Sequence, residues 1–292
     1  MLIAQNIING LLLGGLYAAV ALGFSLVWGV MNVINLAHGA FIMIGAYITF
    51  WIFYFFKVDP FLTIPVSMAI TFGMGYLLQK YIINLIVRTQ VFMVFILTFG
   101  LEILLMNITN LVCTADFRSI TTSYSGAGLS LGAITIPYIR LGIGGLAILL
   151  TALLSLFLAK TKTGNAIKAT SLNKEGAQLV GVDIGKIYTI TFAISAATAG
   201  AAGSLLGNIV AISPYMGGTY TFKAALIVCL GGLGSIPGVI AGGIVVGIAE
   251  TMGSYLISPG YKEFIAFVLL VIILIVRPQG LMGKKFYAVI QH

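Results

Sequence analysis

The chain of 292 residues is 60% hydrophobic and only 8% charged, with a formal net charge of +8. So little polar surface excludes a soluble globule of this length and predicts an integral membrane protein whose main solvent is lipid. The basic residues lie in several short connections rather than in one patch. This distribution is typical of cytoplasmic loops and excludes nucleic acid as a partner.

Long apolar segments follow one another from the N-terminus. No charged side chain occurs in residues 1–56, which hold two helices and a short turn at about 20 residues per crossing. No basic n-region precedes a cleavage site, so we expect no cleaved signal. Hydropathy predicts spans at Ile7–Trp28, His38–Phe56, Phe61–Gln79, Val91–Val112, Leu141–Ala159 and Ile187–Ile212.

Two basic connections set the predicted orientation. One contains Lys80 and Arg88, and the other, residues 160–186, carries five lysines against two acids. Two spans separate them, so a single orientation places both in the cytoplasm and the N-terminus outside. The segment 113–140 is then external, and its turn residues and alternating run Ala133–Ile136 predict a small hairpin or ordered loop.

In the C-terminal third the sequence predicts a break between two helical pieces, because glycine and proline gather in residues 231–237 within an apolar run. We expect Phe222–Leu230 to enter from outside, the chain to turn at Gly231–Pro237, and Gly238–Ile257 to return outward. A last helix, Phe264–Val276, then ends in the cytoplasm. Irregular backbone at membrane depth needs cover from protein or a water-filled cavity, so the break is a candidate wall of a substrate path. A tight turn between two ordinary short spans is the alternative.

These segments predict an all-α, polytopic bundle of about eight spans with broken or re-entrant helices, as one transmembrane domain over residues 1–292. The N-terminus is expected outside and the C-terminus in the cytoplasm. Glycines four residues apart predict close helix packing: Gly203 and Gly207, Gly238 and Gly242, Gly243 and Gly247.

The connection 160–186 has the signals of a short capped helix. Asn173 suits the N-cap, Glu175 lies in the first turn, and Gly181 suits the left-handed position after the last turn. Such a helix, presenting Ala177, Leu179 and Val180, is expected to dock on a partner. The alternative is a helix that lies in the lipid interface.

Polar side chains within apolar segments are the remaining candidates. Asn32, Asn35 and His38 should point inward, either as a hydrogen-bond network or as part of the translocation path. Only two histidines occur, and one is terminal, so spacing identifies no metal site and no cofactor is expected. Glu102 and Glu250 are acids deep in apolar stretches, serving either in transport or in structural pairing.

Three further residues have simpler interpretations. Lys223, at the start of the broken helix, is expected to reach toward the external surface. Cys113 and Cys229 are expected to act as small apolar side chains.

Over nearly its whole length the chain resembles the permease subunits of branched-chain amino-acid ABC importers, the LivH type. The stretches that carry the resemblance are Gly14–Ala18 with Ala21–Gly23, Val33–Gly39 with Gly45–Tyr47, Gly164–Val182, Gly231–Gly238 and Arg277–Gly283. Two positions depart from the pattern. Lys168 stands where these permeases usually carry arginine, and Gly176 stands where alanine usually follows the glutamate.

The resemblance implies a subunit in the cell membrane of a prokaryote that works with a second permease, often a different chain, with two ATPase subunits and with an external substrate-binding protein. The residues expected along the substrate path are Asn32, Asn35, His38, Gly39, Gly231, Gly232, Gly234 and Ser235. The residues expected to couple to the ATPases are Gly164, Lys168, Ala169, Asn173, Glu175, Ala177, Leu179 and Gly181.

The chain itself is not expected to hydrolyse ATP. Residues 181–187 come nearest to a Walker A sequence, but they are one residue short and lack its magnesium-binding Ser or Thr. Two other functions stay open at this point. One is the same type of importer carrying urea or a short amide, and the other is an ion-coupled carrier that uses Glu102 and Glu250.

Overall fold

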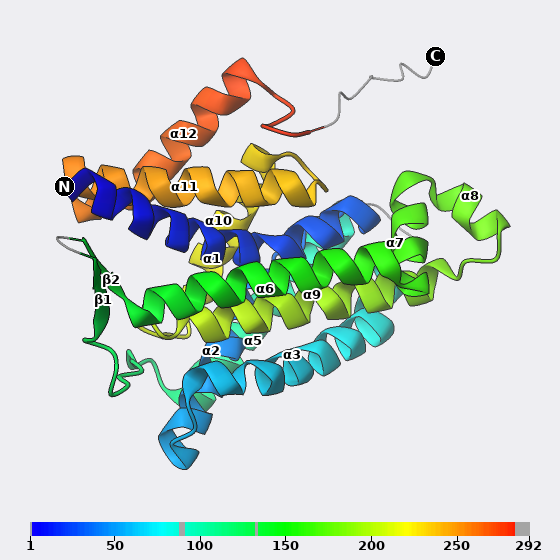
Figure 1. The fold of residues 1–292 in the computed structure, drawn as a ribbon. Helices are drawn as coiled ribbons and strands as arrows, with labels where there is room; N and C mark the ends of the chain where they lie inside the picture. The colour runs from blue at the N-terminus through cyan, green and yellow to red at the C-terminus, as the bar shows by residue number, and fades with distance from the viewer. Residues whose placement is uncertain (1, 88–90, 132–133, 284–292) are drawn as a thin grey trace.

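Helices make up most of the computed structural model, which describes residues 2–87, 91–131 and 134–283 (Figure 1). Over these residues eight helical segments are long and apolar enough to cross a membrane, and α10, with 16 residues, is shorter. The predicted polytopic bundle of about eight spans is therefore confirmed. The helices of the bundle are α1 (Leu2–Met31), α2 (His38–Phe56), α3 (Ile64–Leu78), α5 (Val91–Cys113), α6 (Tyr138–Lys160), α9 (Ile184–Leu206), α10 (Met216–Gly231), α11 (Ile236–Leu256) and α12 (Lys262–Val276).

Short helical turns extend two of these elements. A 3-10 turn, η1 (Pro60–Thr63), leads into α3, and a π turn, η2 (Gln79–Ile83), followed by α4 (Asn84–Ile86), continues it. Asp59 begins this span, because its Oδ1 accepts a hydrogen bond from Phe61 N at 2.9 Å beside a proline at the first position. A second 3-10 turn, η3 (Pro259–Tyr261), precedes α12.

Several predicted spans have different limits in the structure. The span predicted at Phe61–Gln79 continues to Ile86, and the segment predicted at Phe222–Leu230 begins at Met216. The first helix extends beyond the predicted Ile7–Trp28 at both ends, since no charged or helix-breaking residue stops it. The predicted span Ile187–Ile212 is wrong at its end, because α9 stops at Leu206. Ile212 instead exchanges two backbone hydrogen bonds with Arg118, at 2.7 and 2.9 Å, in an isolated β-bridge. Hydropathy did not reveal this, because an apolar residue in a bridge scores the same as one in a membrane-spanning helix.

One end of the bundle carries a β-hairpin, hereafter the hairpin end. Strand β1 (Gly128–Leu131) pairs antiparallel with β2 (Ile134–Pro137), with Leu129 opposite Ile136. The predicted hairpin is confirmed, although Ala133 lies outside the described residues. Gln5 ties α1 to this hairpin, because its side chain both donates to Thr135 O at 2.6 Å and accepts from Thr135 N at 2.9 Å.

The loop before the hairpin is also fixed to the bundle. Tyr124 donates a hydrogen bond to Asp59 Oδ2 at 2.7 Å. Burial, together with this bond to a carboxylate, raises the pKa of Tyr124 to about 12. The start of α1, the end of α2 and the hairpin therefore lie on the same side of the molecule.

The opposite end carries the connection between α6 and α9, hereafter the α8 end (Figure 1). It holds α7 (Lys162–Leu172) and α8 (Lys174–Leu179). Thr161 begins α7, because its Oγ1 accepts from Gly164 N at 2.9 Å. Gly164 lies so close to the backbone of Leu158 that a Cβ there would meet Leu158 Cα at 2.6 Å.

Glycines let the central helices touch backbone to backbone. A Cβ on Gly14 would meet Ile244 Cα at 2.6 Å, and one on Gly243 would meet Ala18 N at the same distance, so α1 and α11 pack without intervening side chains. The predicted packing role holds for five of the six paired glycines, which contact neighbouring helix backbones: Gly203, Gly238, Gly242, Gly243 and Gly247. Gly207 instead lies against the Ile212 side chain.

Candidate functional site

The break predicted at residues 231–237 is present between α10 and α11. Gly232 and Gly234 have φ values of 110° and 72°, which side chains with a Cβ rarely adopt. Ser235 Oγ then caps α11 by accepting from Gly238 N at 3.2 Å, and Pro237 follows at a position where no backbone donor is needed. The sequence therefore located both the end of one helix and the start of the next.

A segment near the C-terminus covers this break. Residues 277–283, hereafter the C-terminal strap, leave α12 and cross the end of α10. Leu281 N donates to Leu230 O at 2.8 Å and Met282 N donates to Gly231 O at 2.9 Å. These bonds occupy carbonyls that the end of a helix leaves without partners. The sequence marked this stretch only by its family resemblance, because a contact between residues 51 positions apart has no local signal.

Two neighbouring cavities lie at the α8 end around the break. The larger, about 520 Å³, is lined by Asn32, by Gly234 and Ser235, by the end of α7 and by the strap. The smaller, about 260 Å³, lies between Gly29 of α1, the same break and Lys168 of α7. Part of the predicted path and part of the predicted coupling segment thus meet at one place, which we call the inner vestibule.

The other polar residues expected on the path lie inside the bundle. His38 is fully buried, and its Nε2 lies 2.8 Å from Val20 O. Asn35 is also buried, and within the described residues neither atom of its amide has a hydrogen-bond partner. Gly39 contacts α10, where its N–H donates to Thr221 Oγ1 at 2.8 Å. Both the network and the path interpretation of these residues therefore remain predictions.

The predicted capped helix in the connection 160–186 is present as α8. Asn173 Oδ1 accepts from Gly176 N at 2.8 Å, and Gly181 has a φ of 86°. Gly176 is next to its own cap, since a Cβ there would lie 3.2 Å from the Asn173 side chain. Glycine therefore avoids a close contact with the capping side chain at this position.

One prediction about α8 is wrong. Ala177, expected to face a partner, is 4% exposed, whereas Leu179 and Val180 are 88% and 80% exposed. The Ala177 side chain is covered because α8 packs on the bundle through contacts with α9. Val182 N donates to the Ala177 carbonyl at 3.0 Å and closes the end of α8. The apolar surface that α8 presents therefore consists of Leu179 and Val180.

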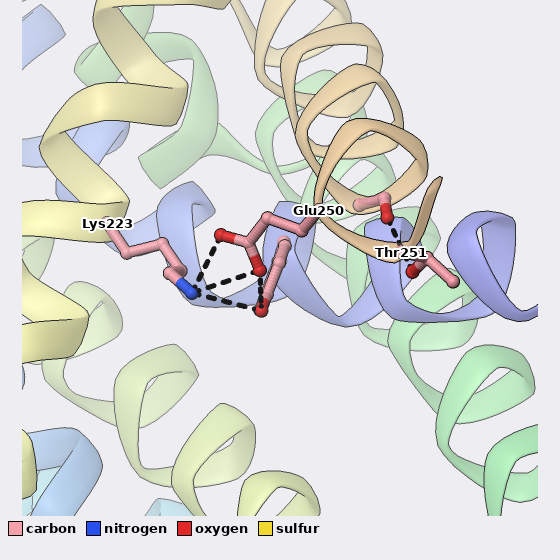
Figure 2. Close-up of polar contacts among 5 residues, drawn as sticks. Lys223, Glu250 and Thr251 are labelled. Atoms are coloured by element: carbon pink, nitrogen blue, oxygen red, sulfur yellow. Dashed lines mark hydrogen bonds and ion pairs between the residues drawn. The ribbon is translucent and has the colours of Figure 1, made fainter. Parts of the chain in front are cut away.

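An ion pair lies between α10 and α11 (Figure 2). Lys223 Nζ is 2.9 Å from Glu250 Oε1 and 3.2 Å from Oε2, and Tyr17 OH donates to Glu250 Oε2 at 2.6 Å. Lys223 also donates to Tyr17 OH at 3.0 Å. The expectation that Lys223 reaches toward the external surface is wrong, because its ammonium pairs with the buried carboxylate of Glu250 and its side chain is only 11% exposed.

The two candidate acids have different environments. Glu250 is the partner of Lys223, in line with the structural-pairing interpretation. Glu102 on α5 is half-buried, and its Oε1 lies 3.6 Å from the position of a Cβ on Gly218 in α10. Sequence reasoning gave Tyr17 no role of its own and named it only within the stretch Gly14–Ala18 that carries the family resemblance.

The two cysteines lie in apolar settings on different elements. Cys113 is buried at the end of α5, where its Sγ accepts from Trp51 Nε1 at 3.4 Å, and Cys229 is half-buried near the end of α10. Both are free thiols.

Comparison with known proteins decides the family. Residues 6–274 match the family model described as the branched-chain amino acid transport system / permease component. The chain belongs to this permease family. It is 31% identical to the high-affinity branched-chain amino acid transport system permease protein BraD of Pseudomonas aeruginosa, over 96% of this chain and 95% of that one.

Two further relatives extend over similar lengths. The chain is 30% identical to the permease protein LivH of Escherichia coli K12, over 96% of this chain and 95% of LivH. It is 27% identical to the probable branched-chain amino acid transport permease LivH of Methanocaldococcus jannaschii, over 94% of this chain and 91% of the relative. No solved structure matched the chain. The protein is thus a multi-pass membrane permease of the branched-chain amino-acid type.

Proposed function

We propose that this permease is one transmembrane subunit of an ABC importer that carries leucine, isoleucine, valine or related small amino acids into a prokaryotic cell across its plasma membrane. The observation that supports it most directly is the family membership over residues 6–274. The α8 end is the cytoplasmic side, because the lysine-rich connection lies there. The hairpin end then faces outward and receives substrate from an external binding protein.

The energy for transport comes from two separate ATPase subunits. They dock on α8, where Leu179 and Val180 form an exposed apolar surface on a rigid, capped helix. Movement of α8 reaches the inner vestibule through α7, since Lys168, Ser171 and Leu172 line the two cavities there. A second permease, identical or different, completes the translocation path, and the break at residues 231–237, with Asn32, forms its inner wall.

Docking is tested by Leu179→Asp, with Gln178→Asp as the matched control because it places the same charge on the same helix. We expect Leu179→Asp to reduce ATP-driven leucine uptake at least tenfold in proteoliposomes while the chain still inserts. Gln178→Asp should retain most of the uptake. Unchanged uptake in Leu179→Asp would remove the docking surface from the proposal.

The orientation is tested separately by single cysteines in a background with Cys113 and Cys229 replaced by alanine. A cysteine at Ser171 should react with an impermeant maleimide only after the membrane is opened, and a cysteine at Thr122 should react in intact cells. The reverse pattern contradicts the proposed orientation.

The same uptake assay separates the rival functions. An ion-coupled carrier would continue without ATPase subunits and stop when the ion gradient is dissipated. The pairing of Glu250 with Lys223 argues against a free proton or sodium carrier at that position. An importer of urea or a short amide would transport those solutes in preference to leucine, which direct competition with labelled leucine measures.

A further inference from the structure

A third cavity, of about 400 Å³, opens at the hairpin end between α1, α6 and α11. Its position follows from its lining. Arg140 lies in the first turn of α6 directly after the hairpin, and Asn6 is next to Gln5, which bonds the hairpin. The cavity extends from there to Tyr17 and Glu250. It is thus distinct from the inner vestibule, and its size falls within the range of small-molecule sites, about 300–1,000 Å³.

The charged groups of this cavity are separated by depth. Arg140 and Lys262 are exposed and lie at its mouth, whereas Glu250 is 1% exposed and lies at its base. Since Lys223 already neutralises Glu250, the two cations at the mouth leave the cavity with a net positive charge. This arrangement attracts the carboxylate of a ligand to the mouth.

The base of the cavity offers hydrogen-bond acceptors. Asn9 Oδ1 is buried and has no hydrogen-bond partner within the described residues, although its side chain lines the cavity. Glu250 Oε2 accepts two hydrogen bonds, whereas Oε1 has only its ion pair with Lys223 and no hydrogen bond within the described residues. A carboxylate has about four acceptor positions. A buried acceptor without a partner is costly, so a donor from a ligand would relieve it. A primary ammonium group supplies three such donors.

Apolar side chains complete the lining. Leu13 and Leu16 of α1 and Ile143 of α6 also line the cavity. A ligand that has a carboxylate, an ammonium group and a short aliphatic side chain satisfies all three surfaces at once. We propose that this cavity is an outer binding site for an aliphatic amino acid zwitterion, with its carboxylate at Arg140 and Lys262 and its ammonium at Asn9 and Glu250. This inference rests on the proposed function and adds a site to it.

The test measures equilibrium binding of L-leucine to the assembled transporter in nanodiscs without the external binding protein. Two analogues separate the ends of the site: leucinamide lacks the carboxylate, and 4-methylpentanoate lacks the ammonium. We expect both to bind at least about tenfold more weakly than leucine, the loss typical of a missing charge-assisted hydrogen bond.

Arg140→Gln and Lys262→Gln test the mouth of the site. Each should raise the Kd for leucine about tenfold and leave the Kd for leucinamide unchanged, because that analogue has no carboxylate for them to bind. Lys57→Gln is the matched control, since Lys57 is an exposed lysine at the same end but does not line the cavity. Equal loss for both ligands, or no loss for either, overturns the site. If phosphoethanolamine displaces a bound lipid from the cavity and leucine does not bind there, the amino-acid site is overturned and the cavity is a lipid headgroup site.

A separate measurement isolates the proposed function. ATP-driven leucine uptake by the wild-type transporter with its binding protein tests the importer itself. If uptake is present but Arg140→Gln does not change leucine binding, only the outer site fails. If leucine is not taken up at all, the proposed function fails first.

Discussion

Replacement of Lys223 by methionine should destabilise the permease strongly, because it leaves Glu250 as a buried charge without its counter-ion. The Lys223 side chain is 11% exposed and the Glu250 side chain 1% exposed, so solvent screens the pair little. Two of the three contacts to the Glu250 carboxylate are lost, and the bond from Tyr17 remains. At about 1.5–3 kcal/mol for each charge-assisted contact, the two lost contacts cost about 3–6 kcal/mol, which agrees with the roughly 3–5 kcal/mol expected for breaking a buried ion pair.

The double variant Lys223→Met with Glu250→Met is the decisive comparison. It removes both charges and leaves only the Tyr17 hydroxyl without an acceptor, which costs about 1–3 kcal/mol. The double variant should therefore be more stable than Lys223→Met alone, although it carries an additional substitution. A strongly non-additive pair of this kind indicates direct coupling between the two side chains.

The free energy of unfolding can be measured by titration with SDS in mixed micelles, with helix content as the signal. Lys162→Met, at an exposed lysine in α7, is the control and should change stability by less than about 0.5 kcal/mol. The reasoning is refuted if Lys223→Met costs less than about 1 kcal/mol, or if the effects of the two single substitutions add in the double variant.

Three further outcomes are expected. Gly45→Ala should lower the free energy of unfolding by about 1–3 kcal/mol in the same SDS titration, since its Cβ would meet the α9 backbone. Gly73→Ala is the control: it has open space around it and should be neutral or stabilising by about 0.5–1 kcal/mol. Gly280→Val, at a φ of 78° and with Cys229 O 2.7 Å from the new Cβ, should release the C-terminal strap, detected as faster proteolysis after α12 with no change elsewhere. The backbone N–H and side chain of Lys186 lower the pKa of Asp183, so the cap that this carboxylate forms on α9 is present above the ordinary pKa of about 3.9 and is lost as pH falls through the lowered value. Amide hydrogen exchange in the first turn of α9 should therefore become faster as pH falls through that range. If the same pH dependence remains in Asp183→Asn, whose side chain does not ionise, the assignment is contradicted.

Local signals in the sequence predicted much of the fold. The spans followed from the length of uncharged runs, because backbone in lipid must satisfy its own hydrogen bonds within a helix. The break after α10 and the α8 cap followed from single residues with strict geometric roles: Gly232, Gly234, Ser235, Asn173 and Gly181. These positions are readable because each constraint acts within a few residues of chain.

The tertiary structure decided what depends on partners far apart in the sequence. Hydropathy carried α9 on to Ile212, which in fact pairs with Arg118, 94 positions earlier. Lys223 turned to Glu250 rather than to the surface, and Ala177 turned inward while Leu179 remained outside. The C-terminal strap and the outer cavity likewise combine residues from distant segments. Composition and caps fix which segments are helices and where they end, but the direction in which a polar side chain points depends on which charge or acceptor the packed bundle brings within reach.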